Sequence, residues 1–505
     1  MTDVLLAGGR VVDPATGTDR IADVLVRDGR VAEVRPRSDA AAPGGPDGAG
    51  GEAAAGPIVV DVTGRIVGPG FVDLHSHVHS IAGQRLQAMD GVTTALDLEM
   101  GLMPVDRAYA RAADEGRPLN HGFSASWTMA RAAVLSGRTS DADPFGDLDI
   151  LNDRAWLGDS TPAQLDRWIG LLEDELAQGA LGIGVLMGYA PRTDPAEFRA
   201  VAQLAAAAGA PTFTHVREIV EADPTTPIDG TLEVARAAMD FGGAAHHCHV
   251  NSTSRRHVDR TLGTIEAART GGAAVTVEAY PYGAGTTGIG AAFLAPEALG
   301  AWDLTPQNLV LVADQERIRD EAHLRHVRAT DPGALVIVEF LDERDERDAA
   351  LLRQSLAFPD SIVASDAMHV TWPDGSTDTR AWPLPPGGQT HPRTAGTFAR
   401  SIRMMVREHG LWTWSEAFRR CSYLPARILD GVAPAATRKG RLSPGADADI
   451  VVIDPTRITD RATYLDSTRP SQGVEHLLVN GCFVVRDGAI VEGSFPGRGL
   501  RGEPR

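Results

Sequence analysis

The chain has 505 residues, of which 43% are hydrophobic, and its formal net charge is −19. A chain of this length can bury a large core and is expected to form more than one domain, while its acidic balance argues against nucleic acid or an anionic membrane surface as a partner. The absence of an 18-residue apolar run, of a signal-peptide start and of closely spaced cysteines predicts a cytoplasmic protein without a disulfide framework.

The two ends of the chain have the same pattern. Residues 3–36 alternate apolar and polar side chains around Gly-Gly and Asp-Gly turn signals, which predicts short antiparallel strands, and residues 440–494 repeat this pattern. We therefore expect segments 1–68 and 432–505 to form one small β-sandwich domain. Within it, residues 38–56 are mostly Ala, Gly and Pro and are predicted to form a flexible loop.

Between residues 69 and 431, short apolar runs alternate with amphipathic helical segments such as 195–208 and 230–241. Strand–helix alternation over this length predicts an α/β fold, a TIM-like (β/α)8 barrel of parallel strands with the helices outside. A doubly wound open sheet is the structural alternative, and the number of runs does not exclude it. The runs include 93–98, 181–185, 211–215, 274–278, 334–338 and 361–366.

The apolar stretch 69–77 ends in His-x-His, and the other predicted site residues are arranged around it. Side chains on a strand alternate between two faces, so His75 and His77 would project together and supply half of a metal site; two ordinary loop histidines are the alternative. Catalytic groups of a (β/α)8 barrel lie where its strands end. Later runs also end in groups that can bind a divalent cation, which predicts one shared site: Asp97 with Glu99, His215, the histidines of the segment 246–249, and Asp366.

Segments along almost the whole chain carry a family resemblance. His-x-His followed by late His, His and Asp is typical of a superfamily, whereas Tyr-Pro-Tyr and His-Pro-Arg-x-x-Gly-Thr-Phe are typical of one family. On these motifs the chain resembles the metal-dependent amidohydrolase superfamily and, within it, the D-aminoacylase (N-acyl-D-amino-acid deacylase) family. The matching segments include PGFVDLHSH (69–77), GVTT (91–94), THVRE (214–218), AYPYGAGTT (279–287), SDA (365–367), HPRTAGTFAR (391–400), SYLPARILDG (422–431) and KGRLSPGADADIVVIDP (439–455).

The resemblance implies a metal-dependent hydrolase with Zn2+ as the expected ion, one or two per chain, and with other divalent metals as options. It implies that His75, His77 and Asp366 form one metal position and that His215 and His249 form the other. Asp366 also matches the general base, which takes a proton from metal-bound water and delivers it to the leaving amine.

For the substrate, the resemblance implies a contact or oxyanion role for Tyr282 and a carboxylate-binding role for Arg393, whose planar guanidinium suits a carboxylate. Arg217 and Asn251 are the remaining substrate-binding candidates. The insertion at about 284–360 resembles the cap that covers the pocket in this family.

The chain departs from the family at a metal ligand. Where the family has the Cys of a Gly-Asn-Cys-Gly motif, this sequence reads Leu-Glu-Met-Gly over 98–101, with Met100 at the Cys position. A thioether is a poor zinc ligand beside a carboxylate, so we expect Glu99 to replace the cysteine and to favour two metal ions over one. The alternative is that Glu99 pairs with Arg217 or solvent and that the site holds a single ion.

A second departure concerns the substrate, because the family's His-x-Lys becomes His-Val-Asn at 249–251 and the pocket is less cationic. The predicted function is hydrolysis of the amide bond of a carboxylate-bearing N-acyl compound, an N-acyl-D-amino acid or a close analogue, by metal-bound hydroxide. The alternatives are a cyclic amide or isoaspartyl-type dipeptide hydrolase on the same fold, and a non-catalytic metal-binding homologue.

Other assignments stay open on the sequence alone. His247 competes with His249 as a ligand, Cys248 either adds a ligand or lies in the barrel wall, and His369 could line the pocket. The number of metal ions, the preference for D or L substrates, and the choice between a monomer and a homo-oligomer are open as well.

Overall fold

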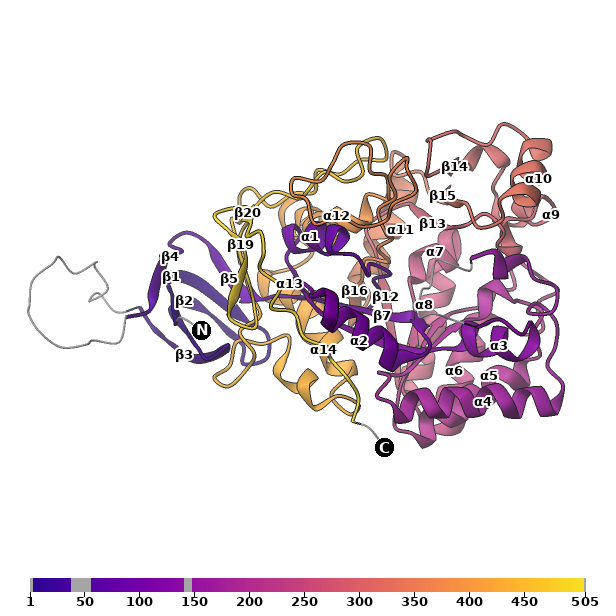
Figure 1. Cartoon of the computed structure of the whole chain (residues 1–505), viewed down its shortest axis with the longest axis horizontal. Helices are drawn as coiled ribbons and strands as arrows, with labels where there is room; N and C mark the ends of the chain where they lie inside the picture. The colour runs from indigo at the N-terminus through magenta and orange to yellow at the C-terminus, as the bar shows by residue number, and fades with distance from the viewer. Residues whose placement is uncertain (1–2, 38–55, 140–147, 504–505) are drawn as a thin grey trace, which may run out of the picture.

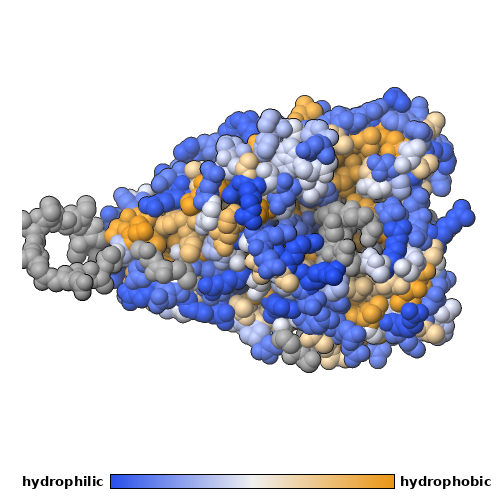
Figure 2. Space-filling view, in the orientation of Figure 1, coloured by the Kyte–Doolittle hydropathy of each residue, from blue (hydrophilic) through white to orange (hydrophobic). Residues whose placement is uncertain are grey.

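The computed structural model describes residues 3–37, 56–139 and 148–503. The predicted flexible loop at 38–56 therefore lies, apart from Gly56, outside the described residues. Figure 1 shows a sheet with the N-terminal strands at one end of the molecule and a larger body of strands and helices beside it. On the face drawn in Figure 2, hydrophilic residues cover most of the surface, and hydrophobic residues form patches between them.

The described residues of both chain ends contribute strands to one nine-stranded sheet, where a small β-sandwich built from both termini is predicted. Its strands are β1 (Val4–Asp13), β2 (Thr18–Arg27), β3 (Arg30–Pro36), β4 (Ile58–Asp61), β5 (Ile66–Pro69), β17 (Ile450–Ile453), β18 (Val474–Val479), β19 (Cys482–Arg486) and β20 (Ala489–Ile490). Their order is β20-β19-β18-β17-β5-β1-β2-β3, with β4 beside β1. The antiparallel pair β5–β17, with Val67 opposite Val452, joins the two ends of the chain. The exact domain boundaries at 68/69 and 431/432 stay a prediction.

In the described part of the middle of the chain, eight parallel strands confirm the (β/α)8 barrel. They are β6 (Phe71–Asp73), β7 (Val92–Leu102), β8 (Asn120–Ser126), β9 (Ile183–Leu186), β10 (Thr212–His215), β11 (Ala245–His247), β12 (Val275–Ala279) and β16 (Ser361–Val363), paired in the order β16-β12-β11-β10-β9-β8-β7-β6. A parallel bridge between Ser76 and Ala367 joins the segments after the first and last strands and nearly closes the sheet. Strand β8 has a largely polar sequence and is absent from the predicted runs.

Helices follow the strands and cover the outside of the barrel (Figure 1). They are α1 (Ile81–Met89), α2 (Val105–Glu115), α3 (Trp127–Leu135), α4 (Pro162–Ala177), α5 (Pro195–Ala207), α6 (Gly230–Phe241), α7 (Val250–Ser254), α8 (Val258–Thr270), α11 (Glu346–Ala357), α12 (Arg393–Ile402), α13 (Trp414–Phe418) and α14 (Leu424–Ile428). Local sequence sets their starts: Thr161 and Gln164 form a capping box at α4, and the Asp229 side chain accepts a hydrogen bond from Leu232 N at α6. The helices predicted at 195–208 and 230–241 correspond to α5 and α6.

The segment between β12 and α11 forms a separate small sheet. Strands β13 (Ala284–Gly288), β14 (Leu309–Leu311) and β15 (Leu335–Glu339) pair antiparallel in the order β13-β15-β14, and α9 (Pro296–Leu299) and α10 (Glu321–Thr330) accompany them. The apolar run 334–338, which the sequence pattern groups with the barrel runs, lies in β15. A strand packed on both faces has the same run of β-branched residues in either sheet, so composition does not distinguish the two.

Candidate metal centre

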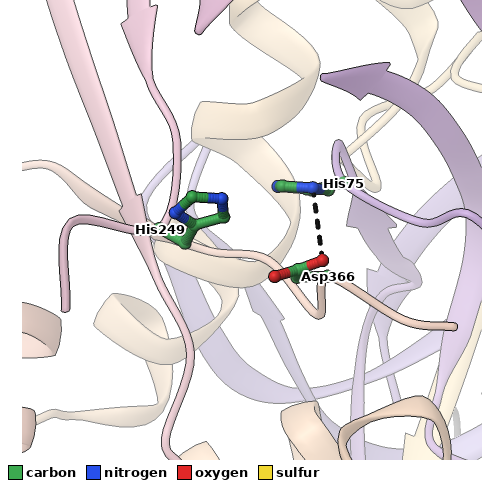
Figure 3. A group of neighbouring side chains, drawn as sticks. All are labelled: His75, His249 and Asp366. Atoms are coloured by element: carbon green, nitrogen blue, oxygen red, sulfur yellow. Dashed lines mark ion pairs between the residues drawn. The ribbon is translucent and has the colours of Figure 1, made fainter. Parts of the chain in front are cut away.

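The side chains predicted to bind metal converge at the carboxyl ends of the barrel strands. Figure 3 shows three of them turned toward one another. His75 and Glu99 are almost fully buried: 1% of the surface of His75 and 4% of the surface of Glu99 are exposed. The converging residues are His75 and His77 after β6, Glu99 in β7, His215 at the end of β10, His249 after β11 and Asp366 after β16.

Four of these side chains bring one atom each to a common point. His75 Nε2 lies 3.1 Å from His77 Nε2, 3.2 Å from Glu99 Oε2 and 3.4 Å from Asp366 Oδ1. His77 Nε2 lies 3.6 Å from Glu99 Oε2 and 3.6 Å from Asp366 Oδ1. A tetrahedron with metal–ligand bonds of about 2.0–2.2 Å has edges of about 3.3–3.6 Å. The separations of both histidines from Glu99 Oε2 and Asp366 Oδ1 are close to these edges, and His75, His77 and Glu99 form one group that could hold a zinc ion.

The other oxygen of Glu99 faces the remaining two histidines. Glu99 Oε1 lies 3.0 Å from His215 Nδ1 and 2.9 Å from His249 Nε2. Two imidazoles and a carboxylate with a fourth position left open form the donor set of a catalytic zinc ion. The Glu99 carboxylate thus lies between two pairs of histidines and offers one oxygen to each pair.

An irregularity in β7 accounts for the way Glu99 reaches this position. The register of β7 against β8 shifts between Asp97 and Leu102, and Gly101 in this stretch has a φ of +65°. Both Glu99 and its neighbour Met100 line the same pocket, although adjacent residues of a regular strand would face opposite sides. The carboxylate meets the histidines, and the thioether forms part of the pocket wall.

Two of the converging residues have strained backbones. His249 has a φ of 31° and Asp366 a φ of 51°, in the left-handed region that residues other than glycine rarely adopt. Such conformations cost on the order of 1–3 kcal/mol each and persist only where the surroundings hold them. In both cases the bend lies two or three residues after the end of a barrel strand, and the side chain lies at the centre.

Negative charge dominates the electrostatics of the centre. Burial lowers the pKa of His75, but the carboxylates of Glu99 and Asp366 outweigh it and raise that pKa well above its ordinary value. Burial likewise lowers the pKa of His77, and Asp97 outweighs it and raises this pKa to about 9. Carboxylates that hold protons on nearby imidazoles at neutral pH would equally stabilise a divalent cation.

Asp366 also contacts Arg393, the first residue of α12. Arg393 Nη2 lies 2.9 Å from Asp366 Oδ1 and donates to the Thr286 carbonyl at 3.3 Å. Arg393 Nε and Nη1 are buried and have no hydrogen-bond partner among the described residues. A Cβ at Gly285 would lie 3.3 Å from Nη1, so this glycine makes room for the guanidinium. Buried unpaired donors of a charged group are costly, and an anionic ligand would satisfy them.

The pocket beside the centre is largely apolar away from these charges. Its wall comes from barrel loops and from the β13–β15 insertion. A pocket with apolar walls and a few convergent polar groups is typical of small-molecule sites. The apolar lining includes Met100, Met129, Leu151, Leu186, Tyr189, Phe293, Trp302, Leu335, Val338 and Phe340.

Three predicted substrate-binding residues lie outside the pocket lining. The Tyr282 hydroxyl donates to the Pro392 carbonyl at 3.4 Å, and Arg400 stacks on its ring. Asn251 Oδ1 accepts a hydrogen bond from the Tyr280 backbone N at 3.2 Å. Arg217 Nε donates to Glu233 at 2.8 Å, so the guanidinium pairs there and not with Glu99.

The structure also places the residues that the sequence left open. His247 Nε2 contacts Thr231 and its Nδ1 contacts the Cys248 carbonyl, while burial lowers its pKa to about 3. Cys248 is buried in the barrel wall beside His75. His369 lines a second, more open cavity near His79.

Sequence reasoning overlooked Tyr280 and Glu278. Tyr280 lines the pocket, and Arg393 lies over its ring at 4.9 Å. Glu278 lies behind His75 near the end of β12. For Glu278 the available signal was its position as a carboxylate at the end of the apolar run 274–278. For Tyr280 there was none, because the Tyr-Pro-Tyr motif does not indicate which of its two rings faces the pocket.

No family model matches the chain. It is 28% identical to an N-acyl-D-glutamate deacylase of Alcaligenes xylosoxydans xylosoxydans, over 95% of this chain and 93% of that protein. It is also 28% identical to a D-aminoacylase of the same organism, over 99% of this chain and 97% of that protein. Both likenesses span nearly complete chains.

The fold resembles a crystal structure of an N-acyl-D-glutamate deacylase from Bordetella bronchiseptica, which holds zinc and a phosphonate mimic of the tetrahedral intermediate. The TM-score is 0.75 with 24% identity, covering 99% of this chain and 100% of the other. A D-aminoacylase structure described as having a binuclear metal centre gives a TM-score of 0.73 with 23% identity and the same coverage.

Proposed function

Because the chain belongs to the D-aminoacylase family of amidohydrolases, we propose that it hydrolyses the amide bond of a carboxylate-bearing N-acyl compound, an N-acyl-D-amino acid or a close analogue. The observation that carries this proposal is the Glu99 carboxylate between two pairs of histidines, with Asp366 and Arg393 beside it. Zinc is the proposed ion, since imidazole and carboxylate donors with tetrahedral spacing suit it.

In this proposal His75, His77, Asp366 and Glu99 hold one ion, and Glu99, His215 and His249 hold the other. A zinc ion held by these residues would lower the pKa of a ligated water to about 7 and would polarise the scissile carbonyl. Asp366 accepts the proton of the attacking water on its carboxylate and returns it to the leaving amine. The strained backbone of Asp366 and the contact with Arg393 Nη2 orient that carboxylate.

Arg393 is proposed to bind the substrate carboxylate through the buried donors that lack a partner. The other cationic side chain among the described lining residues, Arg138, pairs with Asp149 at 2.7 Å. One cation with spare donors suits a substrate with one carboxylate and an apolar remainder. The proposed contributions of Tyr282, Asn251 and Arg217 are indirect, through the packing and hydrogen bonds that hold the pocket residues.

Arg393→Ala should lower kcat/KM for carboxylate-bearing substrates by about 10²-fold or more, because a buried charge-assisted contact is lost. The measurement is steady-state kinetics on an N-acyl-D-amino acid and on the matching N-acyl amine, which lacks the carboxylate. Wild type and variant should hydrolyse the neutral amide at similar rates. Equal losses on both substrates would assign Arg393 to holding Asp366 instead.

A substrate screen tests the proposed function itself. The zinc-loaded protein should release a carboxylic acid from N-acetyl-D-methionine or N-acetyl-D-leucine, with a slower reaction on N-acetyl-D-glutamate because Arg138, the other cation among the described lining residues, already pairs with Asp149. Mass spectrometry also distinguishes ring opening of a hydantoin or dihydropyrimidine, which would support the cyclic-amide alternative. Zinc-loaded protein with no turnover on either class would contradict the proposal and favour the non-catalytic alternative.

The proposed cellular location depends on the cysteines. No helix within the described ranges is both long and apolar enough to cross a membrane. The three cysteines form no disulfide. We keep the cytoplasm as the proposed compartment, because free cysteines are typical of a reducing environment.

A further inference from the structure

One buried carboxylate outside the candidate ligand set contacts both halves of the metal centre. Glu278, near the end of β12, is 1% exposed. Its Oε1 accepts from His75 Nδ1 at 2.5 Å and from the backbone N of His249 at 3.2 Å. Its Oε2 lies 2.9 Å from His246 Nε2, and His246 Nδ1 lies 2.8 Å from the Thr276 hydroxyl. The one carboxylate of Glu278 therefore contacts the side chains of His75 and His246 and the backbone of His249.

These contacts fix two different features of the centre. A neutral imidazole carries one N–H, so an anionic acceptor at His75 Nδ1 leaves the lone pair on Nε2, the atom that faces Glu99 and His77. The bond to the His249 backbone N holds that residue in its left-handed conformation, with a φ of 31°. That conformation in turn brings His249 Nε2 to Glu99.

A second carboxylate acts on one half of the centre alone. Asp97 Oδ1 lies 3.1 Å from His77 Nδ1, and its Oδ2 lies 2.8 Å from His79 Nε2. Asp97 also accepts from the Gly101 backbone N at 3.2 Å. These three contacts involve neither His215 nor His249. Asp97 therefore provides an internal comparison for Glu278.

We propose that Glu278 is a positioning residue that sets the metal affinity of both halves of the centre, whereas Asp97 affects the His75–His77 half alone. The inference rests on the metal centre of the proposed function, but not on its substrate. Removing such an outer carboxylate typically weakens metal binding by about 10–100-fold. Glu278→Gln keeps the size of the side chain and removes its charge, so it isolates the effect of the anionic acceptor.

The test is zinc binding to the full-length protein, with stoichiometry from metal analysis and affinity from competition with a chromophoric chelator. Glu278→Gln should weaken every zinc ion that the wild type binds by about 10–100-fold. Asp97→Asn should weaken one ion and spare the other. Glu197→Gln is the matched control, because Glu197 is equally buried but pairs with Arg131 on the outside of the barrel; its zinc affinity should equal that of the wild type.

Circular dichroism of each variant checks folding. If Glu278→Gln does not fold, Glu278→Asp keeps the charge on a side chain one methylene shorter, and it should weaken zinc binding at both positions by a smaller factor. Wild-type affinity in a folded Glu278 variant, or weakening confined to one ion, would overturn the inference. If the wild type binds zinc but turns over no substrate, the proposed function is contradicted. The zinc affinities of the Glu278 and Asp97 variants would still test the role of Glu278.

Discussion

Replacing Glu99 with alanine should remove zinc from the centre and lower kcat/KM by about 10³-fold or more, close to the loss of all metal-dependent chemistry. Glu99 Oε2 faces His75 and His77, and Glu99 Oε1 faces His215 and His249. Both halves would lose the shared anionic donor: the His215–His249 half would keep two imidazoles only, and the His75–His77 half would keep Asp366 as its one carboxylate. Metal analysis after gel filtration and steady-state kinetics measure the two effects.

A second substitution controls for nonspecific damage. The double variant Glu99→Ala with Met100→Cys places a thiolate where the family has its cysteine, on a residue that already lines the pocket. Because zinc accepts sulfur and oxygen donors alike, we expect part of the zinc content to return. Full zinc occupancy and activity in Glu99→Ala alone would show that the four histidines and Asp366 suffice, and that Glu99 is an acceptor for their N–H groups only.

Asp366→Asn should lower kcat by about 10²–10⁴-fold, the usual contribution of a general base, while zinc stays bound. The amide keeps the shape of the side chain and still accepts from Arg393 Nη2, so KM should change far less than kcat. His75, His77 and Glu99 remain around the same point in this variant. The measurements are kcat and KM with zinc in excess, together with zinc content.

The role of Asp366 follows from whether kcat and zinc content fall together or separately in Asp366→Asn. If Asp366→Asn loses zinc in proportion to its activity, the loss of the ligand accounts for the loss of activity, and the proposed general-base role of Asp366 is contradicted. If KM rises and kcat is unchanged, the carboxylate acts by holding Arg393 in place. Asp97→Asn provides the comparison, since it lies in the same half of the centre but does not face the pocket.

The barrel and the residues at its rim can be predicted from the order of apolar and polar residues over short stretches of the sequence. A parallel strand buried on both faces is a run of apolar residues, and the polar residue that ends each run lies at the same rim as the others. These patterns place His75, His77, His215 and Asp366 at one rim, whereas the choice of His249 over His247 depends on the family resemblance. The family's cysteine motif points to positions 99 and 100, and donor chemistry favours Glu99 over Met100. The register shift in β7 is the structural reason that the carboxylate can reach the histidines.

The sequence by itself determined which chemical groups stand at the ends of strands, because alternation along a strand and the barrel rule are local properties. Tertiary structure alone decided which of those groups face the centre and what supports them. Arg217 turns to Glu233, Tyr282 packs under Arg400, and Glu278 reaches His75 across the barrel. Each of these contacts joins residues whose proximity no local pattern encodes, since it depends on how separate strands and helices pack.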